Sequence, residues 1–456
     1  MKKRWTRRHF LRSQLQVLLA AGLAPVWIPG TALGGSGRAG ASQRIGLGVI
    51  GTGPQGRAVM SGFLAQPDVQ VVAVCDVKKD QLELARRAVN QHYGNSDCRT
   101  YGDFRELLSC PDVDAVLIAT PDHWHVHMAV AAVRAGKDIY LEKPMGLSLA
   151  EDQILRREVQ RHQRVFQFGT QQRSSREFQR ACALVRAGRI GRLRQIRVWC
   201  AASRPGGSTT PAPVPPTIDY DFWLGPAPYS PYTEDKCAAD NKTWWFIYDY
   251  ALGWIAGWGV HPLDIALWGH PRMLEGPLQV EGRAIFPTQG ACNTAIAWHV
   301  EFRFHDGVRM EFRGTRNGYP EVNELNDLRP WEARYGPIAD HGTAFEGDEG
   351  WVLVHRGSLR THPETLAEMA DPLVQQLPRV STNHVRDFVD AVKTRQSTVC
   401  PIEEAYRADL LCQLSDIATR VARPLRFDPG REQFVEDAEA DRRLELRPRR
   451  SPWTLG

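Results

Sequence analysis

Two short motifs carry the side chains best suited to move a proton. Glu142-Lys143-Pro144 follows a short apolar run, and the segment 257–264 (GWGVHPLD) contains His261. Removing a hydride from a carbinol requires a base for the hydroxyl proton, and histidine has a pKa near neutrality. A lysine at a strand end can reach a cofactor ribose and a substrate hydroxyl together. Lys143 and His261 are therefore our candidates for proton transfer.

The same side chains also allow simpler interpretations. A lysine taken alone is more often a surface residue, and a histidine taken alone more often packs in a core. The strand-end position of Lys143 favours a role in chemistry. Asp264 stands three residues after His261. It contacts substrate, orients the imidazole, or caps a helix whose first turn suits Pro262.

A glycine-rich turn near the start of the chain is typical of dinucleotide binding. Gly51, Gly53 and Gly56 follow an apolar run and precede a helical pattern. Gly51 makes the turn, Gly53 lets the backbone approach a pyrophosphate, and Gly56 lets the helix close on the strand. Asp76 ends the next apolar run about twenty residues later, where a carboxylate accepts from ribose hydroxyls and repels a 2′-phosphate.

We therefore expect NAD as the cofactor, with NADP disfavoured and with Gln55 as a further contact in the turn. The alternative is a glycine-rich turn in an ordinary α/β domain.

Strand and helix patterns alternate beyond the glycine turn and position these motifs. An apolar run, residues 113–120, predicts a buried parallel strand. Three side chains stand at or just after its end, Thr120, Pro121 and His125. We expect them to contact the cofactor, as does Glu142 after the next strand. Short connections throughout predict a doubly wound parallel sheet with ligands at the carboxyl ends of its strands.

From about residue 170 the pattern changes. Residues 278–286, 294–304 and 308–313 alternate apolar and polar side chains, and Asp306-Gly307 is a hairpin signal. Such runs predict a large open mixed or antiparallel sheet rather than further parallel units.

The predicted fold class is α/β with two domains. Residues 42–169 form a Rossmann domain and residues 170–430 a C-terminal α/β domain for substrate binding and oligomerisation. Residues 431–456 are expected to be a tail, or an arm over a neighbouring subunit.

Residues 1–41 are expected to be an export signal. Thr6-Arg7-Arg8-His9-Phe10-Leu11-Arg12 is a twin-arginine pattern, and Ala39-Gly40-Ala41 offers a small-x-small cleavage site. This pattern predicts the twin-arginine translocase as a partner and a periplasmic or otherwise exported location. The alternative is a basic N-terminal tail.

Charge and cysteine content exclude two classes of function. Residues 1–41 hold seven basic and no acidic side chains, so the remainder has 50 basic against 52 acidic residues. This balance leaves no basic field for nucleic acid. The nine cysteines show no CxxC spacing and no zinc-like cluster with histidine, so we expect neither a disulfide framework nor a metal site.

The region before His261 is dense in aromatic side chains, on which sugar rings can stack. We expect Tyr250 and Trp258 to line the substrate pocket and the others to pack in the core. Arg173 follows the strand that ends the first domain. It either binds a substrate oxygen or pairs with an acid.

Taken together, these motifs resemble the Gfo/Idh/MocA oxidoreductases, the family of glucose–fructose oxidoreductase and inositol dehydrogenase. The resemblance covers nearly the whole mature chain, including the closing Arg447-Pro448-x-x-x-Pro452-Trp453. It implies a tightly held nicotinamide cofactor, sugar or polyol substrates, and Lys143 and His261 as a catalytic pair. It also implies homo-dimers or homo-tetramers that pair through the open sheet.

One position departs from the family pattern. The family usually carries an aspartate four residues before the catalytic histidine, where this chain has Gly257. Either Asp249 or Asp264 replaces that carboxylate, or the chemistry has changed, or the protein only binds sugar.

The leading hypothesis is an exported NAD-dependent oxidoreductase acting on the CH–OH group of a sugar or polyol. Two alternatives stay open. One is an NAD-dependent glycoside hydrolase that oxidises its sugar transiently and returns the hydride. The other is a catalytically impaired sugar-binding homologue.

Overall fold

The computed structural model describes residues 39–238, 243–316 and 318–455. The chain divides into two compact units, residues 1–44 and residues 45–456. The predicted twin-arginine motif lies outside the described residues. Among the described residues of the first unit, Ala41–Gln43 form a short 3-10 turn. Among the described residues, no helix has the length and apolarity needed to cross a membrane.

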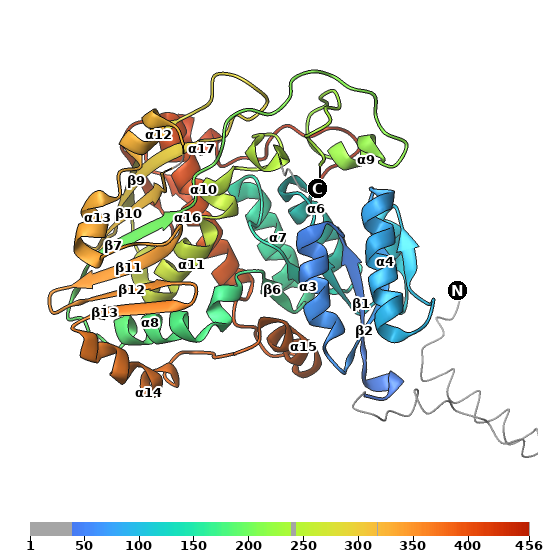
Figure 1. The fold of residues 1–456 in the computed structure, drawn as a ribbon, viewed down its shortest axis with the longest axis horizontal. Coiled ribbons are helices and arrows are strands. Elements are labelled where there is room, and N and C mark those ends of the chain that lie inside the picture. Colours follow the sequence, from blue (N-terminus) through green and yellow to red (C-terminus); the bar gives the residue numbers. More distant parts are fainter. Residues whose placement is uncertain (1–38, 239–242, 317, 456) are drawn as a thin grey trace, which may run out of the picture. The chain divides into compact units, whose positions relative to one another are not determined.

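The first domain of the second unit is built on a fully parallel six-stranded sheet in the order β3-β2-β1-β4-β5-β6 (Figure 1). Its central strands are buried along their whole length, which explains their uninterrupted apolar runs. The strands are β1 (Ile45–Ile50), β2 (Val69–Cys75), β3 (Arg99–Tyr101), β4 (Ala115–Ile118), β5 (Asp138–Leu141) and β6 (Phe166–Phe168). The helices are α3 (Pro54–Leu64), α4 (Lys79–Tyr93), α5 (Phe104–Ser109), α6 (Asp122–Arg134) and α7 (Leu149–His162). The predicted doubly wound parallel sheet is confirmed.

The second domain contains a nine-stranded mixed sheet in the order β13-β12-β11-β7-β10-β9-β8-β14-β15. Only β7 and β10 run parallel to each other; the other neighbours are antiparallel. The strands are β7 (Leu193–Cys200), β8 (Leu278–Ile285), β9 (Ala297–Arg303), β10 (Arg309–Gly314), β11 (Gly342–Gly347), β12 (Trp351–His355), β13 (Ser358–His362), β14 (Leu425–Asp428) and β15 (Gln433–Phe434). The expected open mixed sheet is therefore present, and it includes strands, among them β11 to β13, that the sequence patterns did not indicate.

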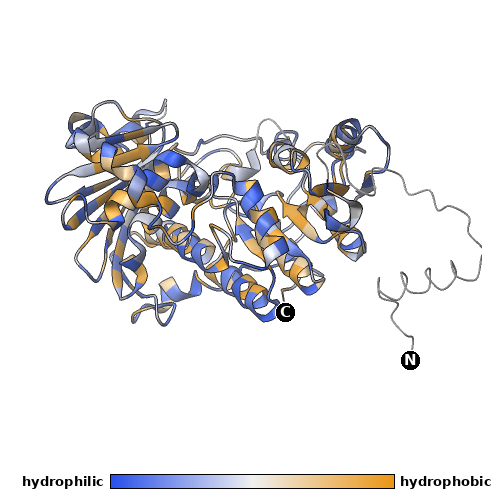
Figure 2. Ribbon diagram, turned by 90° about the horizontal axis from the view of Figure 1, so that it is seen from below, coloured by the Kyte–Doolittle hydropathy of each residue, from blue (hydrophilic) through white to orange (hydrophobic). Residues whose placement is uncertain are grey.

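Three long helices pack against this sheet: α8 (Arg176–Arg186), α11 (Val260–Gly269) and α16 (Ile402–Val421). Helix α16 contacts β8, α11 and α7, so it joins the two domains. Its side chains are buried on nearly every face for that reason. Figure 2 shows the hydrophobic segments facing the interior of both domains. The remaining helices are α9 (Tyr220–Leu224), α10 (Trp254–Gly257), α12 (Pro320–Leu325), α13 (Arg329–Tyr335), α14 (Ala370–Val374), α15 (His384–Thr394) and α17 (Ala438–Arg442), with 3-10 turns at Gln171–Ser174, Thr243–Phe246, Pro271–Leu274 and Glu364–Met369.

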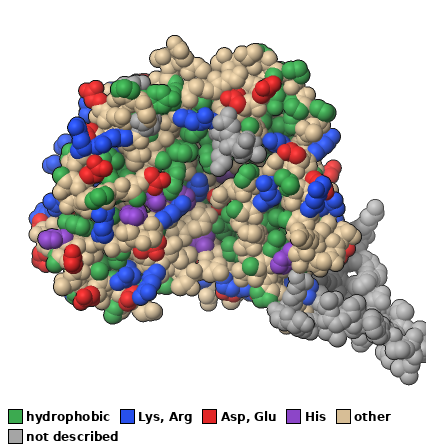
Figure 3. All heavy atoms as spheres, viewed as in Figure 1, with side chains coloured by type: hydrophobic (Ala, Val, Ile, Leu, Met, Phe, Trp, Pro, Cys, Tyr) green, Lys and Arg blue, Asp and Glu red, His purple; other side chains and the backbone are tan. Residues whose placement is uncertain are grey.

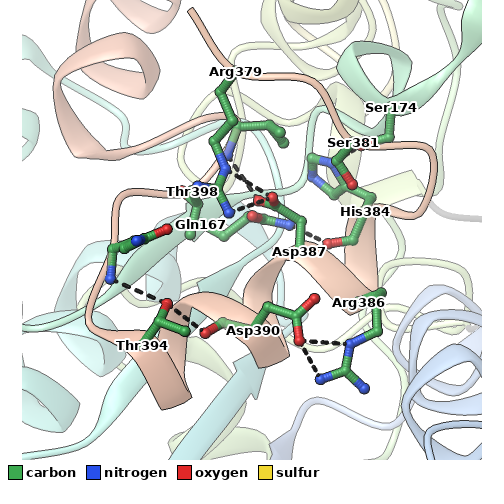
Figure 4. Close-up of polar contacts among 12 residues, drawn as sticks. Gln167, Ser174, Arg379, Ser381, His384, Arg386, Asp387, Asp390, Thr394 and Thr398 are labelled. Carbon is green, nitrogen blue, oxygen red and sulfur yellow. Dashed lines mark hydrogen bonds and ion pairs between the residues drawn. The ribbon is translucent and has the colours of Figure 1, made fainter.

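Helix α15 returns from the second domain to the first (Figure 4). The Arg386 guanidinium makes a bidentate ion pair with Asp68, with N···O distances of 2.6 and 2.9 Å. The ring nitrogens of His384 lie 2.9 Å from the Ser174 hydroxyl and 2.8 Å from the Phe168 carbonyl oxygen. The ion pair fixes α15 to the residue before β2, and His384 fixes it to the carboxyl end of β6.

Residues 204–238, the covering loop, cross from the second domain onto the first. The Asp219 backbone N–H donates to the Val77 carbonyl at 3.1 Å, and the Lys79 N–H donates to the Thr217 carbonyl at 2.8 Å. Lys78 Nζ donates to the Cys237 carbonyl at 2.8 Å. The loop is therefore attached just beyond the end of β2.

Residues 444–455, the C-terminal arm, hold this loop from the outside. The Trp453 ring lies edge-on to Trp124 of α6 and to Phe222 of α9, with centroids 4.7 and 5.2 Å apart. Arg450 Nε donates to the Gly225 carbonyl at 3.0 Å. The described part of the expected tail thus packs against its own chain.

Candidate functional site

The glycine turn between β1 and α3 has the shape that a pyrophosphate requires. Gly51 adopts a φ of +85°, and a Cβ there would lie 2.5 Å from the Ala119 carbonyl oxygen. A Cβ at Gly56 would lie 2.0 Å from the Gly51 oxygen, whereas one at Gly53 would meet nothing within 4 Å. Gly51 and Gly56 therefore permit close backbone packing, and Gly53 faces open space at the start of α3, where backbone N–H groups are free to bind an anion.

Asp76 stands at the end of β2 with both carboxylate oxygens anchored. One oxygen accepts from the Thr52 backbone N–H at 2.7 Å and from its hydroxyl at 3.1 Å. The other accepts from the Lys78 N–H at 2.9 Å. Burial raises the pKa of Asp76, and these donors oppose that rise. Each oxygen keeps lone pairs for ribose hydroxyls, so the site fits NAD.

A cavity opens at the carboxyl ends of β1, β2, β4 and β5. The predicted cofactor residues that line it are Gly51, Gly53, Gln55, Asp76, Thr120, Pro121, His125, Glu142 and Lys143. Gly56 lies behind the turn instead. The opposite wall is aromatic and comes from the covering loop and the turn after it, with Phe222, Trp223, Trp244 and Trp245. The residues present thus enclose a dinucleotide from two domains.

His125 connects two of the loops that line this cavity. Its Nδ1 lies 2.7 Å from the Pro144 carbonyl oxygen and its Nε2 lies 2.9 Å from that of Thr120. Burial lowers the pKa of His125 to about 4, so the ring is neutral and donates to one carbonyl at a time. The Lys143-Pro144 bond is cis. Thr120 Oγ1 is buried and has no partner among the described residues, so it is available to a ligand.

Lys143 links the cavity to the second domain. Its Nζ donates a 2.8 Å hydrogen bond to the Gly257 carbonyl oxygen and lies 5.8 Å from the centre of the Trp245 ring. Gly257 ends α10, four residues before His261 in α11, and the Lys143 charge acts on the His261 imidazole, so Lys143 and His261 belong to the same site.

His261 lies in the first turn of α11 and is buried. Burial, then the positive charges of Lys143 and Arg356, hold the pKa of His261 well below its ordinary value. Its Nδ1 has no partner within the described parts of the chain. A neutral imidazole with an unoccupied nitrogen next to an ammonium group can accept a hydroxyl proton.

Asp122 is a site residue that the sequence-based selection missed. It lines the cavity, and its Oδ2 is buried without a partner among the described residues. Burial raises the pKa of Asp122 well above its ordinary value, while the Lys143 ammonium opposes the rise. Its position directly after Thr120-Pro121 was the available signal.

Three predicted substrate residues, Arg173, Asp264 and Tyr250, are not among those that line this cavity, and for Arg173 the structure shows the alternative, pairing with an acid. Arg173 makes a buried bidentate ion pair with Asp264 at 2.6 and 2.8 Å and also contacts Glu404 at 3.0 Å. The charged groups of Arg173 and Asp264 thus join α11 to the 3-10 turn Gln171–Ser174 and to α16. The Tyr250 hydroxyl lies 2.6 Å from the Ser230 hydroxyl, with the ring against His123.

Trp258, the fourth predicted substrate residue, does lie beside the catalytic candidate. Its ring centroid is 5.4 Å from that of His261, and it is only partly buried. It remains a candidate for sugar contact.

Comparison with known proteins places this geometry in context. Residues 45–170 match the model of the GFO_IDH_MocA oxidoreductase family with its NAD-binding Rossmann fold. Residues 199–322 and 338–455 match the C-terminal α/β domain of the same family.

Curated relatives match over part of their length. A glycosyl hydrolase family 109 protein of Saccharopolyspora erythraea is 39% identical over 115 residues, which is 24% of this chain and 25% of the relative. The myo-inositol 2-dehydrogenase of Thermotoga maritima is 29% identical over 174 residues, or 38% of this chain and 47% of the relative. The chain thus spans a quarter to a half of these proteins.

Solved structures share the fold over most of their length. The WlbA dehydrogenase of Bordetella pertussis, in complex with NADH and UDP-GlcNAcA, superposes with a TM-score of 0.60 at 15% identity, covering 84% of this chain and 98% of that chain. Scyllo-inositol dehydrogenase of Lactobacillus casei, with NAD(H) and scyllo-inositol, gives 0.57 at 15% identity, covering 85% and 99%. Because the family models match both domains, the chain belongs to the GFO/IDH/MocA oxidoreductase family, with an NAD-binding Rossmann domain and a C-terminal α/β domain.

Proposed function

We propose that this protein is an NAD-dependent oxidoreductase acting on the CH–OH group of a sugar or polyol. The observation that carries the proposal is the 2.8 Å hydrogen bond from Lys143 to the Gly257 carbonyl. It brings a lysine from the dinucleotide cavity and a neutral buried imidazole into one site. The inositol dehydrogenases among the relatives support a polyol-like substrate.

Each side chain of the site has a distinct role in hydride and proton transfer. NAD, when bound, supplies the hydride acceptor. His261 takes the hydroxyl proton as general base, because its lowered pKa keeps it deprotonated over a wide pH range. Lys143 orients the hydroxyl and stabilises the developing alkoxide by its charge. Asp122 lines the same cavity, and the Lys143 ammonium favours the ionised form of its carboxyl group, against the effect of burial.

The covering loop and the C-terminal arm support a cofactor that stays bound. The loop forms one wall of the cavity, and Trp453 and Arg450 hold it against α6. These contacts would slow the release of a nucleotide bound between the walls. Tight retention suits an enzyme without access to a free NAD pool.

A second candidate function is glycoside hydrolysis through transient oxidation, followed by elimination, addition of water and return of the hydride. The glycosyl hydrolase family 109 relative favours it. Net redox change would be zero, and the same Lys143 and His261 would act.

We also propose export through the twin-arginine pathway and assembly into homo-dimers or homo-tetramers. Buried, unpaired cysteines are compatible with passage of a folded chain into an oxidising compartment. Replacing Arg7 and Arg8 by Lys should retain the protein in the cytoplasm, as fractionation would test. Light scattering of the purified protein measures the assembly.

The decisive experiment starts with mass spectrometry of the nucleotide released from purified protein. A panel of sugars and polyols is then followed at the nicotinamide absorbance, and aryl glycosides are followed for phenol release. Reduction of bound NAD by a sugar supports the dehydrogenase. Phenol release without added NAD supports the hydrolase. Bound NAD that responds to no substrate contradicts both.

A further inference from the structure

Arg356 lies against Trp258, which in turn contacts the catalytic candidate His261. It occupies the turn between β12 and β13, and its guanidinium lies 4.7 Å from the centre of the Trp258 ring. The same ring is 5.4 Å from His261 and 4.6 Å from His341. Figure 3 shows Lys, Arg and His side chains together near the middle of the face viewed there.

The charge of Arg356 has no counter-ion among the residues that the structure describes. Its backbone N–H donates to His341 Nε2 at 3.3 Å, but its guanidinium makes no hydrogen bond or ion pair there. Asp340 is the acid that acts on it, yet the Asp340 carboxylate lies 2.7 Å from His341 Nδ1.

Partial burial lowers the pKa of Arg356, although a guanidinium stays protonated at any working pH. Arg360, on the neighbouring strand, provides the contrast. Its guanidinium donates to the Tyr335 and Pro337 carbonyls at 2.7 and 2.8 Å.

We propose that Arg356 forms an anion subsite next to His261 and that the substrate is an acidic sugar whose carboxylate it binds. This inference rests on the proposed function and names its substrate class. A guanidinium presents a planar fork of donors that matches a carboxylate bidentately. The positive field of Lys143 and Arg356 at His261 also favours an anionic ligand.

The test compares three ligands that differ at a single carbon: D-glucuronate, D-glucose and D-glucose 6-phosphate. Dissociation constants are measured by calorimetry and by tryptophan fluorescence on the protein as purified, with its own cofactor. We expect glucuronate to bind at least tenfold more tightly than glucose. Added salt should reduce that preference, because the contact is ionic.

Three variants identify the residue responsible. R356Q should lower the glucuronate-to-glucose ratio at least tenfold, and R356K should restore part of it, because it keeps the charge but loses the fork. Arg309 is the control position, far from the subsite. It pairs with Gln195 near the start of β7, whereas the strand residue next to His341 pairs with Trp199 near the end of β7. R309Q removes the same charge there and should leave the ratio unchanged. Thermal unfolding checks that each variant is folded.

Several outcomes would overturn the inference. They are equal binding of glucuronate and glucose by the wild type, a ratio unchanged in R356Q, stronger binding of glucose 6-phosphate than of glucuronate, or no response to any of the three ligands.

Different results would contradict the proposed function and the anion subsite. Glucuronate binding that depends on Arg356 without any change at the nicotinamide absorbance would keep the subsite and remove the dehydrogenase. Reduction of bound NAD by neutral sugars, with no effect of R356Q on selectivity, would support the dehydrogenase and contradict the subsite.

Discussion

The ammonium group of Lys143 donates a 2.8 Å hydrogen bond to the backbone carbonyl of Gly257. Gly257 is the position at which the family usually carries a carboxylate. Here a carbonyl dipole accepts from the lysine in place of a side chain. The lysine therefore keeps its orientation toward α11, but the full negative charge of an aspartate is missing from this position.

Lys143→Ala should retain bound NAD and lose at least ~10²-fold in turnover, since it removes the group that orients the hydroxyl. Released nucleotide is quantified by mass spectrometry and turnover by nicotinamide absorbance. Full activity with normal NAD content would exclude Lys143 from the mechanism.

Gly257→Asp should shift the acid limb of the kcat/KM profile to higher pH. A Cβ at Gly257 would meet only Trp254, at 3.8 Å, so the side chain can be accommodated. Burial and nearby cations hold the pKa of His261 well below its ordinary value, and an added carboxylate favours its protonated form. Gly257→Ala is the control for backbone effects and should leave the limb in place. A Gly257→Asp profile identical to that of Gly257→Ala would refute this electrostatic account.

Gly53→Ala and Gly56→Ala should fail in different ways. The new methyl at Gly53 points into open space, so the protein should fold normally and lose at least tenfold in NAD affinity. The methyl at Gly56 would lie 2.0 Å from the Gly51 oxygen, and relieving that contact should cost about 1–3 kcal/mol of folding stability. Thermal unfolding and nucleotide content distinguish the two. Equal loss of stability in both variants would be inconsistent with the turn geometry.

Trp453→Ala should accelerate NAD exchange several-fold, because its ring holds Phe222 and Trp124 together at the edge of the cavity. Exchange is measured with excess isotopically labelled NAD. Trp351→Ala, which removes a partly buried tryptophan from β12, is the matched control. Equal NAD exchange rates in both variants would show that the C-terminal arm does not contribute to cofactor retention.

Asp152→Asn should raise the melting temperature more at about pH 8 than at about pH 5. Burial, and then Asp409, raise the pKa of Asp152 well above its ordinary value. A raised folded-state pKa gives stability that is complete below the unfolded value and lost as pH rises toward the folded one. The asparagine amide removes this titration while keeping a donor for Asp409. Asp97→Asn on the exposed surface is the control, and a benefit independent of pH would contradict the prediction.

The sequence predicted best where the deciding interactions are local. The helical patterns of residues 149–162 and 402–421 lie within single segments, and α7 and α16 span these same residues. The glycine turn and the strand-end motifs fixed most of the cofactor cavity for the same reason.

Contacts between residues far apart in the sequence were not predicted. Arg173 and Asp264 lie 91 positions apart, and nothing in either segment indicates that they neutralise each other. Strands β11 to β13 are short and gain their stability from cross-strand neighbours. Arg356 lies in a two-residue turn without a motif, so only the folded hairpin reveals its position over Trp258.

The position of the C-terminal arm in the sequence determines when the nucleotide site is completed during synthesis. The nucleotide site begins with the first strand at Ile45, yet the residues that secure its outer wall, Arg450 and Trp453, are translated near the end of the described chain. A ribosome-bound chain can form the glycine turn, but it cannot secure that wall until synthesis has passed Trp453. If the arm retains NAD as we propose, stable capture of NAD comes late in maturation, after the arm has been synthesised.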